Sequence, residues 1–272
     1  MIKIPRFVEQ LIPYKAGKPI SELAREKNLT RIVKLASAEN PLGSSPKALK
    51  AIEEALSGLN RYSDPASYDL VQAIAEKYSV QPNHIICGHG TDSLLAYIVS
   101  AFTEEGDEII TCEGTFIGIY VSISKTGRKL IKLPLRYYGF DLEALQGAIT
   151  EKTSMIYLAN PNNPTGTMFS DKEFEAFMAK VPDHIMVILD EAYTDYASEF
   201  DGYPNGIRYD YDNLVITRTL SKAQGLAGLR IGFAVGPDKV IEALYKVKLP
   251  FEPNLLAQQA GIAALDDDEF LK

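Results

Sequence analysis

The side chains best able to do chemistry in this 272-residue chain follow runs of apolar residues. One run ends in Asp190, and Tyr193 comes three residues after it. A second run is followed by Ser221 and Lys222, and Arg230 comes eight residues after that lysine. In doubly wound sheets, ligands bind beyond the carboxyl ends of the strands. We therefore expect these polar side chains to meet at one ligand site.

Two further polar segments also follow apolar runs. Segment 88–93 is a glycine turn with Thr91 and Asp92 ahead of a helical pattern. The free N–H groups and positive end of such a helix suit a phosphate, although an ordinary capped turn explains the same residues. Segment 160–166, Asn-Pro-Asn-Asn-Pro-Thr-Gly, is a turn whose asparagines can aim their amides, and it is also plausible without a function. An isolated Ser-Lys pair, likewise, is usually a solvated surface pair.

Together the four segments meet the needs of one cofactor, pyridoxal 5'-phosphate. This cofactor needs a lysine that forms an imine, a carboxylate that keeps its ring nitrogen protonated, and anchors for its phosphate and phenolic oxygen. An apolar run that ends in Asp-Glu is also typical of P-loop ATPases, but G-x-x-x-x-G-K-[ST] is missing. Gly88-His89-Gly90 lacks the third glycine of a dinucleotide fingerprint.

Composition limits the class of protein. With 46% hydrophobic and 24% charged residues, the chain is typical of a globular protein with a sizeable core. Its net charge of -8 argues against binding to nucleic acid or to an anionic membrane. No apolar stretch reaches the roughly 18 residues of a membrane helix. The 2 cysteines and 3 histidines show no metal-ligand spacing. We expect small-molecule partners, no metal and a cytoplasmic location.

Strand-like and helix-like patterns alternate along the chain. The β-rich runs are 84–87, 108–112, 129–133, 155–159, 185–189, 213–217 and 230–235. Helical patterns, such as 68–78, lie between most of them. The run 185–189 is apolar throughout, which is typical of a strand covered by helices on both faces. We predict an α/β fold with a mainly parallel, mixed seven-stranded sheet flanked by helices.

The two ends of the chain differ from this middle part. Residues 1–45 contain four prolines and one convincing helical pattern, over 21–27, so we predict an N-terminal arm. Residues 46–252 contain the predicted strands and form the large, cofactor-binding domain. A helical pattern begins again at Asn254. We expect 253–272 to be the start of a linker helix toward a small domain that this chain lacks.

The sequence resembles the fold-type-I aminotransferases, most closely the histidinol-phosphate aminotransferase family. The matching segments cover most of the chain in the family's order: 34–43, 61–65, 88–92, 115–116, 160–166, 190–193 and 218–232. The resemblance implies the large domain of the fold-type-I transferases that depend on pyridoxal phosphate. It also implies a homodimer whose subunits share their sites.

The resemblance implies a role for each residue around the cofactor ring. Lys222 would form the imine and, once displaced by the substrate amine, move the proton between the substrate Cα and the cofactor. Asp190 would pair with the pyridinium nitrogen, and Asn163 and Tyr193 would donate to the phenolic oxygen. Lys222, Asp190 and Tyr193 are therefore the predicted catalytic residues. Phe116 would stack on the ring, although a core position explains this aromatic residue equally well.

A second set of residues would hold the cofactor phosphate. The resemblance places Thr91, Asp92, Ser221 and Arg230 around it, through backbone N–H, hydroxyl and guanidinium groups. Gly90 belongs to the same predicted set of cofactor-binding residues.

The remaining predicted site residues lie near the start of the chain. Tyr62 resembles the tyrosine that reaches the cofactor phosphate of the neighbouring subunit, which is the basis for the predicted homodimer. Tyr14 matches a family position near the substrate phosphate. Asn40 and Gly43 lie on the part of the arm that borders the substrate.

Some positions depart from the family pattern. Ala38 stands where the family often has asparagine, Ser63 where it has proline, Ser93 where it has an acidic residue, and Gln224 where it has an aromatic residue. These departures affect the inferred substrate more than the cofactor. Family chains also continue for roughly another half-domain with the arginine that grips the substrate carboxylate, so we expect a truncated form.

We expect amino transfer between L-histidinol phosphate and 2-oxoglutarate, a step of histidine biosynthesis, by an enzyme that depends on pyridoxal phosphate. Two alternatives share this scaffold: an aromatic amino-acid aminotransferase and a threonine-phosphate decarboxylase. An alternative of another class is a cofactor-binding module without turnover. The expected partners are a small-molecule amino donor and a 2-oxo acid, with no nucleic acid and no membrane.

Overall fold

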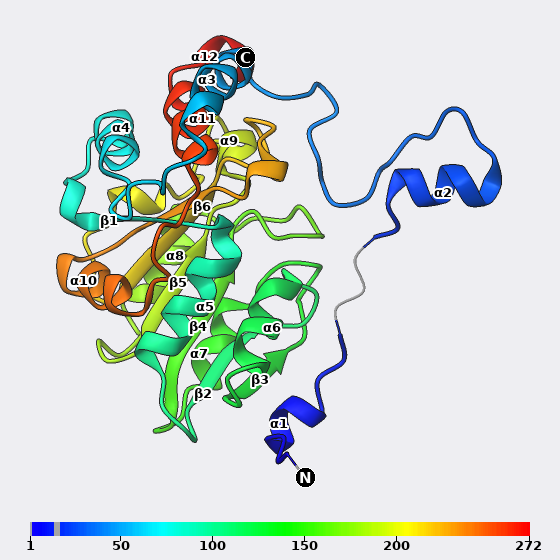
Figure 1. Ribbon diagram of the computed structural model, residues 1–272. Coiled ribbons are helices and arrows are strands. Elements are labelled where there is room, and N and C mark those ends of the chain that lie inside the picture. The colour runs from blue at the N-terminus through cyan, green and yellow to red at the C-terminus, as the bar shows by residue number, and fades with distance from the viewer. Residues whose placement is uncertain (1, 14–16) are drawn as a thin grey trace.

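A seven-stranded sheet forms the centre of the computed structural model, which describes residues 2–13 and 17–272 (Figure 1). The strand order is β1-β7-β6-β5-β4-β2-β3. The strands are β1 (Ile85–Gly88), β2 (Glu108–Cys112), β3 (Lys129–Leu133), β4 (Thr153–Ala159), β5 (Met186–Asp190), β6 (Leu214–Thr219) and β7 (Gly232–Val235). Strand β7 is antiparallel to both neighbours, and all other pairs are parallel. The predicted fold class is confirmed.

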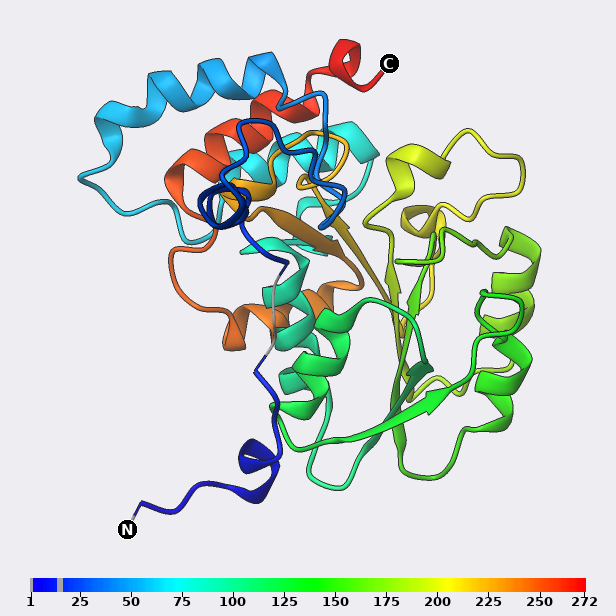
Figure 2. The ribbon, with the colours of Figure 1, turned by 90° about the vertical axis from the view of Figure 1, so that its right-hand side faces the viewer.

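Helices cover both faces of this sheet (Figure 2). The α-helices are α1 (Arg6–Glu9), α2 (Ile20–Lys27), α3 (Pro46–Ala55), α4 (Tyr68–Tyr78), α5 (Gly90–Phe102), α6 (Ile117–Ser124), α7 (Leu142–Gly147), α8 (Asp171–Met178), α9 (Thr194–Ala197), α10 (Asp238–Val247), α11 (Leu255–Leu265) and α12 (Asp268–Leu271). Four 3₁₀ turns join them: η1 (Leu56–Gly58), η2 (Pro82–His84), η3 (Gly206–Arg208) and η4 (Ala227–Leu229). One face packs against α5, α6 and α10, and the other against α3, α4 and α11 at one end and α7 and α8 at the other.

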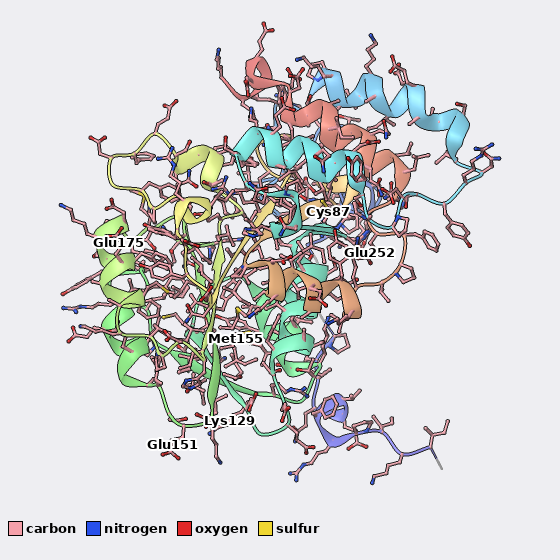
Figure 3. The ribbon with its side chains drawn as sticks, turned by 90° about the vertical axis from the view of Figure 1, so that its left-hand side faces the viewer. Cys87, Lys129, Glu151, Met155, Glu175 and Glu252 are labelled. Atoms are coloured by element: carbon pink, nitrogen blue, oxygen red, sulfur yellow. The ribbon has the colours of Figure 1, made fainter. Side chains whose placement is uncertain are left out.

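The central strands are apolar on both faces because both faces are covered. On β5, Met186 and Ile188 belong to one core cluster, whereas Val187 and Leu189 belong to the opposite one. Met155 on β4 is fully buried, in contrast to charged side chains at the surface such as those of Glu151 and Glu175 (Figure 3). Strand β3 lies at the edge of the sheet and exposes Lys129 and Lys132, which is typical of edge strands.

The sheet topology brings the polar segments of the sequence to one edge. Strands β1, β2, β4, β5 and β6 run in the same direction, so the residues that follow them emerge at the same end of the sheet. Strand β7 runs the opposite way and therefore begins at that end. The segments 88–92, 115–116, 160–166, 190–193 and 218–230 thus become neighbours although they are far apart in the sequence.

The N-terminal segment extends away from the sheet, whereas the C-terminal helix α11 packs against it. Helix α2 has no buried residue and stands away from the sheet, and the predicted helix 21–27 matches it (Figure 1). The prediction of a single helix in the arm was wrong, because the arm also contains the short helix α1. Phe7 of this helix packs near Gly127. Helix α11 begins after the cap Asn254, as predicted, and packs against α3 and α4. The division into arm, large domain and linker helix stays a prediction.

The helices and the titratable side chains of the described residues bear on membrane crossing and metal binding. Within 2–13 and 17–272, none of the helices combines the length and apolar composition that a bilayer crossing needs. Over the same ranges, no three or more His, Cys, Asp or Glu side chains gather as a metal-binding group. The expected cytoplasmic location stays a prediction.

Gly232 allows β7 to lie directly against the turn between β1 and α5. A Cβ at this position would stand 2.9 Å from backbone atoms of Gly90 and Thr91 and 3.0 Å from the Arg218 carbonyl oxygen. We predict that Gly232→Ala lowers the free energy of unfolding by about 1–3 kcal/mol, because backbone must move to admit the methyl group. Denaturant unfolding would measure this loss. Gly147→Ala, where a Cβ meets nothing within 4 Å, is the matched control, and equal losses would contradict the prediction.

Candidate active site

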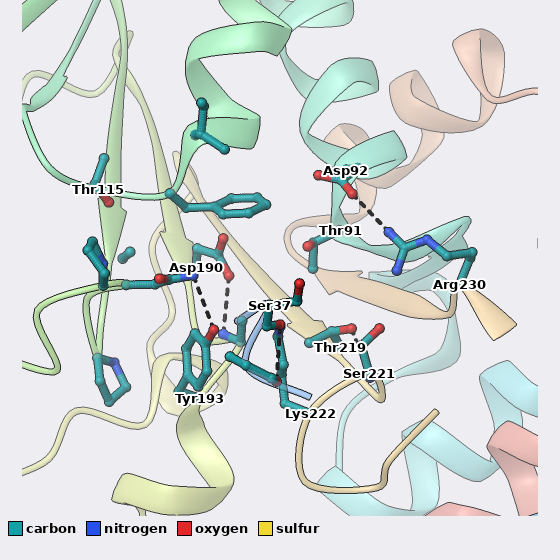
Figure 4. A pocket seen from close by; sticks show the side chains of 18 residues that line it. Ser37, Thr91, Asp92, Thr115, Asp190, Tyr193, Thr219, Ser221, Lys222 and Arg230 are labelled. Carbon is teal, nitrogen blue, oxygen red and sulfur yellow. Dashed lines mark hydrogen bonds and ion pairs between the residues drawn. The ribbon is translucent and has the colours of Figure 1, made fainter. Parts of the chain in front are cut away.

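The polar segments line one pocket at the carboxyl edge of the parallel strands (Figure 4). Its volume is about 580 Å³, which is within the range of small-molecule sites. The lining residues are Ser37, Ala38, Thr91, Asp92, Thr115, Phe116, Ile117, Ala159, Pro161, Asn163, Pro164, Asp190, Ala192, Tyr193, Thr219, Ser221, Lys222 and Arg230.

Most of the site residues expected from the sequence lie in this pocket. Nine of them line it: Thr91, Asp92, Phe116, Asn163, Asp190, Tyr193, Ser221, Lys222 and Arg230. Gly90 borders it at a backbone φ of 72°, and a Cβ there would stand 2.8 Å from Nη2 of Arg230. A side chain at Gly90 would therefore displace the Arg230 guanidinium, which explains the need for glycine.

Lys222 is the amine of the pocket. It lies on the loop after β6, and its Nζ donates to the carbonyl oxygens of Ser37, at 3.2 Å, and Ala38, at 3.4 Å. Burial lowers the pKa of Lys222, and the neighbouring Arg230 cation lowers it further, while Asp190 and other carboxylates act in the opposite direction. A larger share of this amine is therefore neutral and nucleophilic than in an ordinary lysine.

Asp190 is the buried carboxylate of the pocket. It ends β5 and is only 3% exposed. The Tyr157 hydroxyl donates to its Oδ2 at 2.7 Å, and the backbone N–H of Ala192 donates to its Oδ1 at 3.1 Å. Burial raises the pKa of Asp190 to about 6, although both hydrogen bonds favour the ionised form. Two hydrogen bonds therefore offset part of the cost of burying this charge, and a cationic group in the pocket would stabilise the ionised carboxylate further.

Asn163 and Tyr193 form a pair of polar groups on the same wall. The Asn163 amide donates to the Tyr193 hydroxyl at 3.1 Å. Burial raises the pKa of Tyr193, and the Asp190 charge raises it further. Tyr193 therefore keeps its proton at neutral pH and can donate a hydrogen bond to a ligand oxygen.

The opposite wall is suited to an anion. Helix α5 begins there, and Arg230 forms an ion pair with Asp92 at 2.8 Å. The Ser221 hydroxyl on this wall and the Thr115 hydroxyl on the other side of the pocket are buried and have no hydrogen-bond partner among the described residues (Figure 4). Because buried polar groups are normally satisfied, two unpartnered hydroxyls in a pocket indicate acceptors or donors on a ligand.

Four expected residues do not line the pocket. Tyr62 is 82% exposed and stacks on Phe251 with ring centroids 4.3 Å apart. The Asn40 amide donates to the Ala223 carbonyl at 2.9 Å, so it holds the arm against the lysine loop. Gly43 contacts that loop as well, since a Cβ at Gly225 would reach its carbonyl oxygen. Tyr14 lies outside the described residues.

Other residues of the site were missed in the sequence. Thr115 could have been predicted, because it immediately precedes Phe116 in a segment that resembles the aminotransferase family. Ser37 and Ala38 contact Lys222 through backbone carbonyls, which any residue type could supply. Tyr157 lies inside an apolar strand, where nothing in the sequence sets it apart from core residues.

Comparison with known proteins agrees with this geometry. Residues 30–272 match the family model for aminotransferase class I and II. The chain is 47% identical to histidinol-phosphate aminotransferase 2 of Hydrogenovibrio crunogenus, over 98% of this chain and 74% of that protein. It is 46% identical to histidinol-phosphate aminotransferase 2 of Haemophilus influenzae strain 86-028NP, over 98% of this chain and 73% of the relative.

Solved structures show the same likeness. The histidinol-phosphate aminotransferase of Sinorhizobium meliloti, in complex with pyridoxal-5'-phosphate, matches with a TM-score of 0.90 and 30% identity over 100% of this chain and 73% of that chain. Aspartate aminotransferase of Thermus thermophilus with maleate matches with a TM-score of 0.85 and 26% identity over 100% of this chain and 75% of that chain.

The lowered pKa of Lys222 can be measured by chemical labelling. We predict that the midpoint pH for acetylation of Lys222 lies below that of exposed lysines, and that Arg230→Met moves it upward. Loss of Arg230 removes a repelling cation and also leaves the Asp92 carboxylate unpaired, and both changes favour the charged amine. Quantitative mass spectrometry over a pH series gives the midpoint.

Arg136→Met is the matched control for this experiment, because the Arg136 side chain is 64% exposed and lies outside the pocket lining. It should leave the Lys222 midpoint unchanged. The same midpoint in Arg230→Met as in the unaltered chain would contradict the assigned cause.

Proposed function

We propose a specific reaction for this chain, which belongs to the family of class I and II aminotransferases. The reaction is amino transfer between L-histidinol phosphate and 2-oxoglutarate, a step of histidine biosynthesis, with pyridoxal phosphate as the cofactor. The observation that carries the proposal is the pocket that holds Lys222 and Asp190 together. The substrate is supported by relatives named histidinol-phosphate aminotransferases, which are 41–47% identical to this chain.

The anionic wall of the pocket fits the phosphate of this cofactor. The first turn of α5, with Gly90, Thr91 and Asp92, offers backbone N–H groups and the positive end of the helix. The unpartnered Ser221 hydroxyl would donate a hydrogen bond, and Arg230 would supply the positive charge. The phosphate would thus satisfy a buried hydroxyl that has no other partner in the described part of the chain.

The opposite end of the pocket fits the ring. Asp190 would pair with the protonated ring nitrogen, and this cation would stabilise the ionised form of a carboxylate that burial otherwise disfavours. Phe116 lines the pocket and packs against the core behind it, so it would cover one face of the ring. Asn163 and Tyr193 would donate to the phenolic oxygen.

Pyridoxal phosphate, when bound, supplies an aldehyde carbon that bonds amines and a ring that withdraws electrons from the α-carbon of the bound amine. Lys222 would attach this group through its Nζ. The same Nζ would accept the proton from the substrate Cα and hold it as an ammonium. Because burial and Arg230 lower the pKa of Lys222, more of this amine is in the proton-accepting neutral form than in an ordinary lysine at the same pH. Asp190 would pair with the ring nitrogen and favour its charged form.

The N-terminal segment supplies part of the pocket lining beside Lys222. We propose that residues 1–45 act as an arm over the large domain 46–252, because Ser37 and Ala38 line the pocket beside Lys222. Asn40 would border the substrate by holding this arm in place.

We also propose that the active form is a homodimer. Tyr62 lies outside the pocket and is 82% exposed, so within its own chain it has no access to the cofactor. Its ring is held in place by stacking on Phe251. An exposed but positioned aromatic side chain is suited to reach the site of a second copy.

The proposed reaction predicts which substrate and which lysine are required. The chain loaded with pyridoxal phosphate should transfer the amino group of L-histidinol phosphate to 2-oxoglutarate, with a higher kcat/KM than for phenylalanine, tyrosine or threonine phosphate. Lys222→Ala should lower kcat by about 10²- to 10⁴-fold or more, because it removes the general base and the covalent attachment. A coupled assay for glutamate gives these rates.

Lys248→Ala is the matched control, because burial also lowers the pKa of Lys248 but its Nζ contacts the Pro65 carbonyl outside the pocket lining. Its rate should stay near that of the unaltered chain. Turnover of aromatic amino acids without turnover of L-histidinol phosphate would refute the substrate. Cofactor binding with no turnover of any donor would favour the binding-module alternative, and full activity of Lys222→Ala would refute the assigned lysine.

The homodimer predicts that two defective chains restore one site. Tyr62→Ala and Lys222→Ala chains, co-expressed in equal amounts, should form mixed dimers in which one of two sites has both residues. About a quarter of all sites should then attach the cofactor at limiting pyridoxal phosphate, more than the mean of the separately produced chains. Borohydride reduction and mass spectrometry count the attached pyridoxyl groups on Lys222.

Tyr68→Ala is the control for this complementation, since Tyr68 is another exposed tyrosine of the same region, at 63% exposure. Alone it should attach the cofactor like the unaltered chain. A mixed sample that equals the mean of its two components would show that Tyr62 does not act across subunits.

A further inference from the structure

Tyr157 lies below the floor of the pocket, and its hydroxyl oxygen contacts the Asp190 carboxylate. It is fully buried on β4 and belongs to the core cluster on the α5 and α6 face of the sheet. In the register of β4 and β5, Tyr157 pairs with Ile188, and Ala159 pairs with Asp190. Paired residues of parallel strands point to the same face, so Tyr157 lies one step diagonally below Asp190. Its hydroxyl donates to Asp190 Oδ2 at 2.7 Å.

This hydroxyl matters because few groups favour a charge on Asp190. The Tyr157 hydroxyl and the backbone N–H of Ala192 donate hydrogen bonds to its carboxylate, and the Thr217 hydroxyl on β6 also lowers its pKa. Lys222, on the loop after β6, is the cation that faces it, whereas Asp92 on α5 repels it. Burial opposes ionisation more strongly than any single group. Removal of one donor would therefore shift the balance toward the neutral acid.

The surroundings of Tyr157 would accept a side chain without the hydroxyl. Its ring shares a core cluster with apolar side chains such as those of Ile188 and Ile98. A phenylalanine of the same shape would fill this space and bury no polar atom. The packing explains the aromatic ring, and only the contact with Asp190 explains the hydroxyl.

We propose that Tyr157 is a positioning residue for amino transfer, whose hydroxyl keeps the Asp190 carboxylate ionised and fixed at the floor of the pocket. This inference rests on the proposed function, in which Asp190 pairs with the cofactor ring nitrogen. Tyr157 does not line the pocket and acts only through Asp190. Its fixed donor also sets the orientation of the carboxylate, since Oδ2 is held from β4 while Oδ1 is held by Ala192.

The direct test is the titration of Asp190 in the protein without added cofactor. Carbon-13 NMR of aspartate-labelled chain follows the carboxyl signals, and Asp190→Asn identifies the relevant one. In Tyr157→Phe, the proton affinity of Asp190 should rise roughly tenfold or more, because a hydrogen bond to a charged group is lost. The sign follows because the lost donor stabilised the ionised form. The midpoint should therefore move up from about pH 6.

Tyr97→Phe is the matched control. The Tyr97 hydroxyl donates to the Glu252 carboxylate at 2.8 Å, which makes a second phenol–carboxylate pair outside the pocket lining. Its loss should leave the Asp190 midpoint unchanged. An unchanged midpoint in folded Tyr157→Phe would overturn the proposal. If that variant does not fold, 3,5-difluorotyrosine at position 157 keeps the shape with a stronger donor, and the midpoint should fall; no fall would overturn the proposal.

Measurements with bound cofactor separate this inference from the proposed function. In Tyr157→Phe, kcat should fall and its acid limb should move to higher pH, because activity needs ionised Asp190, while KM for the amino donor should stay nearly constant. A merely structural role would leave the acid limb in place and would overturn the proposal. If the unaltered chain attaches no cofactor, the proposed function fails, yet the Asp190 titration still decides whether Tyr157 controls that carboxylate.

Discussion

The burial of carboxylates at the end of β5 is the constraint on which this site depends. Asp190 and Glu191 are adjacent and 3% and 1% exposed, so each needs compensation inside the protein. Asp190 receives donors from Tyr157 and Ala192, on the pocket side. Glu191 Oε2 accepts from Arg218 Nε at 2.9 Å and from Arg218 Nη2 at 2.6 Å, and Oε1 accepts the backbone N–H of Gly206 at 2.7 Å. The Asp190 carboxylate lines the pocket, while the Glu191 carboxylate is hydrogen-bonded within the protein.

The Glu191–Arg218 ion pair is structural, and it differs from Asp190 in the partners of its carboxylate. Arg218 is 5% exposed, donates also to Asn205 Oδ1, and stacks its guanidinium 4.9 Å from the ring centroid of Tyr78. Both carboxylate oxygens of Glu191 therefore accept hydrogen bonds, and the pair joins the end of β5 to β6. Asp190 faces Lys222 across a pocket instead of contacting it. An Asp-Glu pair that ends an apolar strand thus serves two purposes on its two sides.

The sequence predicted elements better than contacts. All seven strands were located within about two residues. For β4, β5 and β6 the reason is that both faces are covered, so each strand contains a run of apolar residues. The run predicted from Arg230 begins as a strand only at Gly232, since Arg230 has a left-handed φ of 55° after η4. Residues that follow strands could be predicted as site residues because the topology brings strand ends together. Tyr157 could not, because its role depends on the register of β4 against β5.

The shifts of the two central groups explain what kind of ligand this pocket is built for. Burial lowers the pKa of Lys222 and raises that of Asp190, so both groups tend toward their neutral forms when nothing else compensates them. A ligand with a cation near Asp190 and an anion near Arg230 would reverse that tendency at the carboxylate and match the unpartnered Ser221 hydroxyl. The charges of the pocket thus fit a ligand that carries a cation at one end and an anion at the other, as pyridoxal phosphate does.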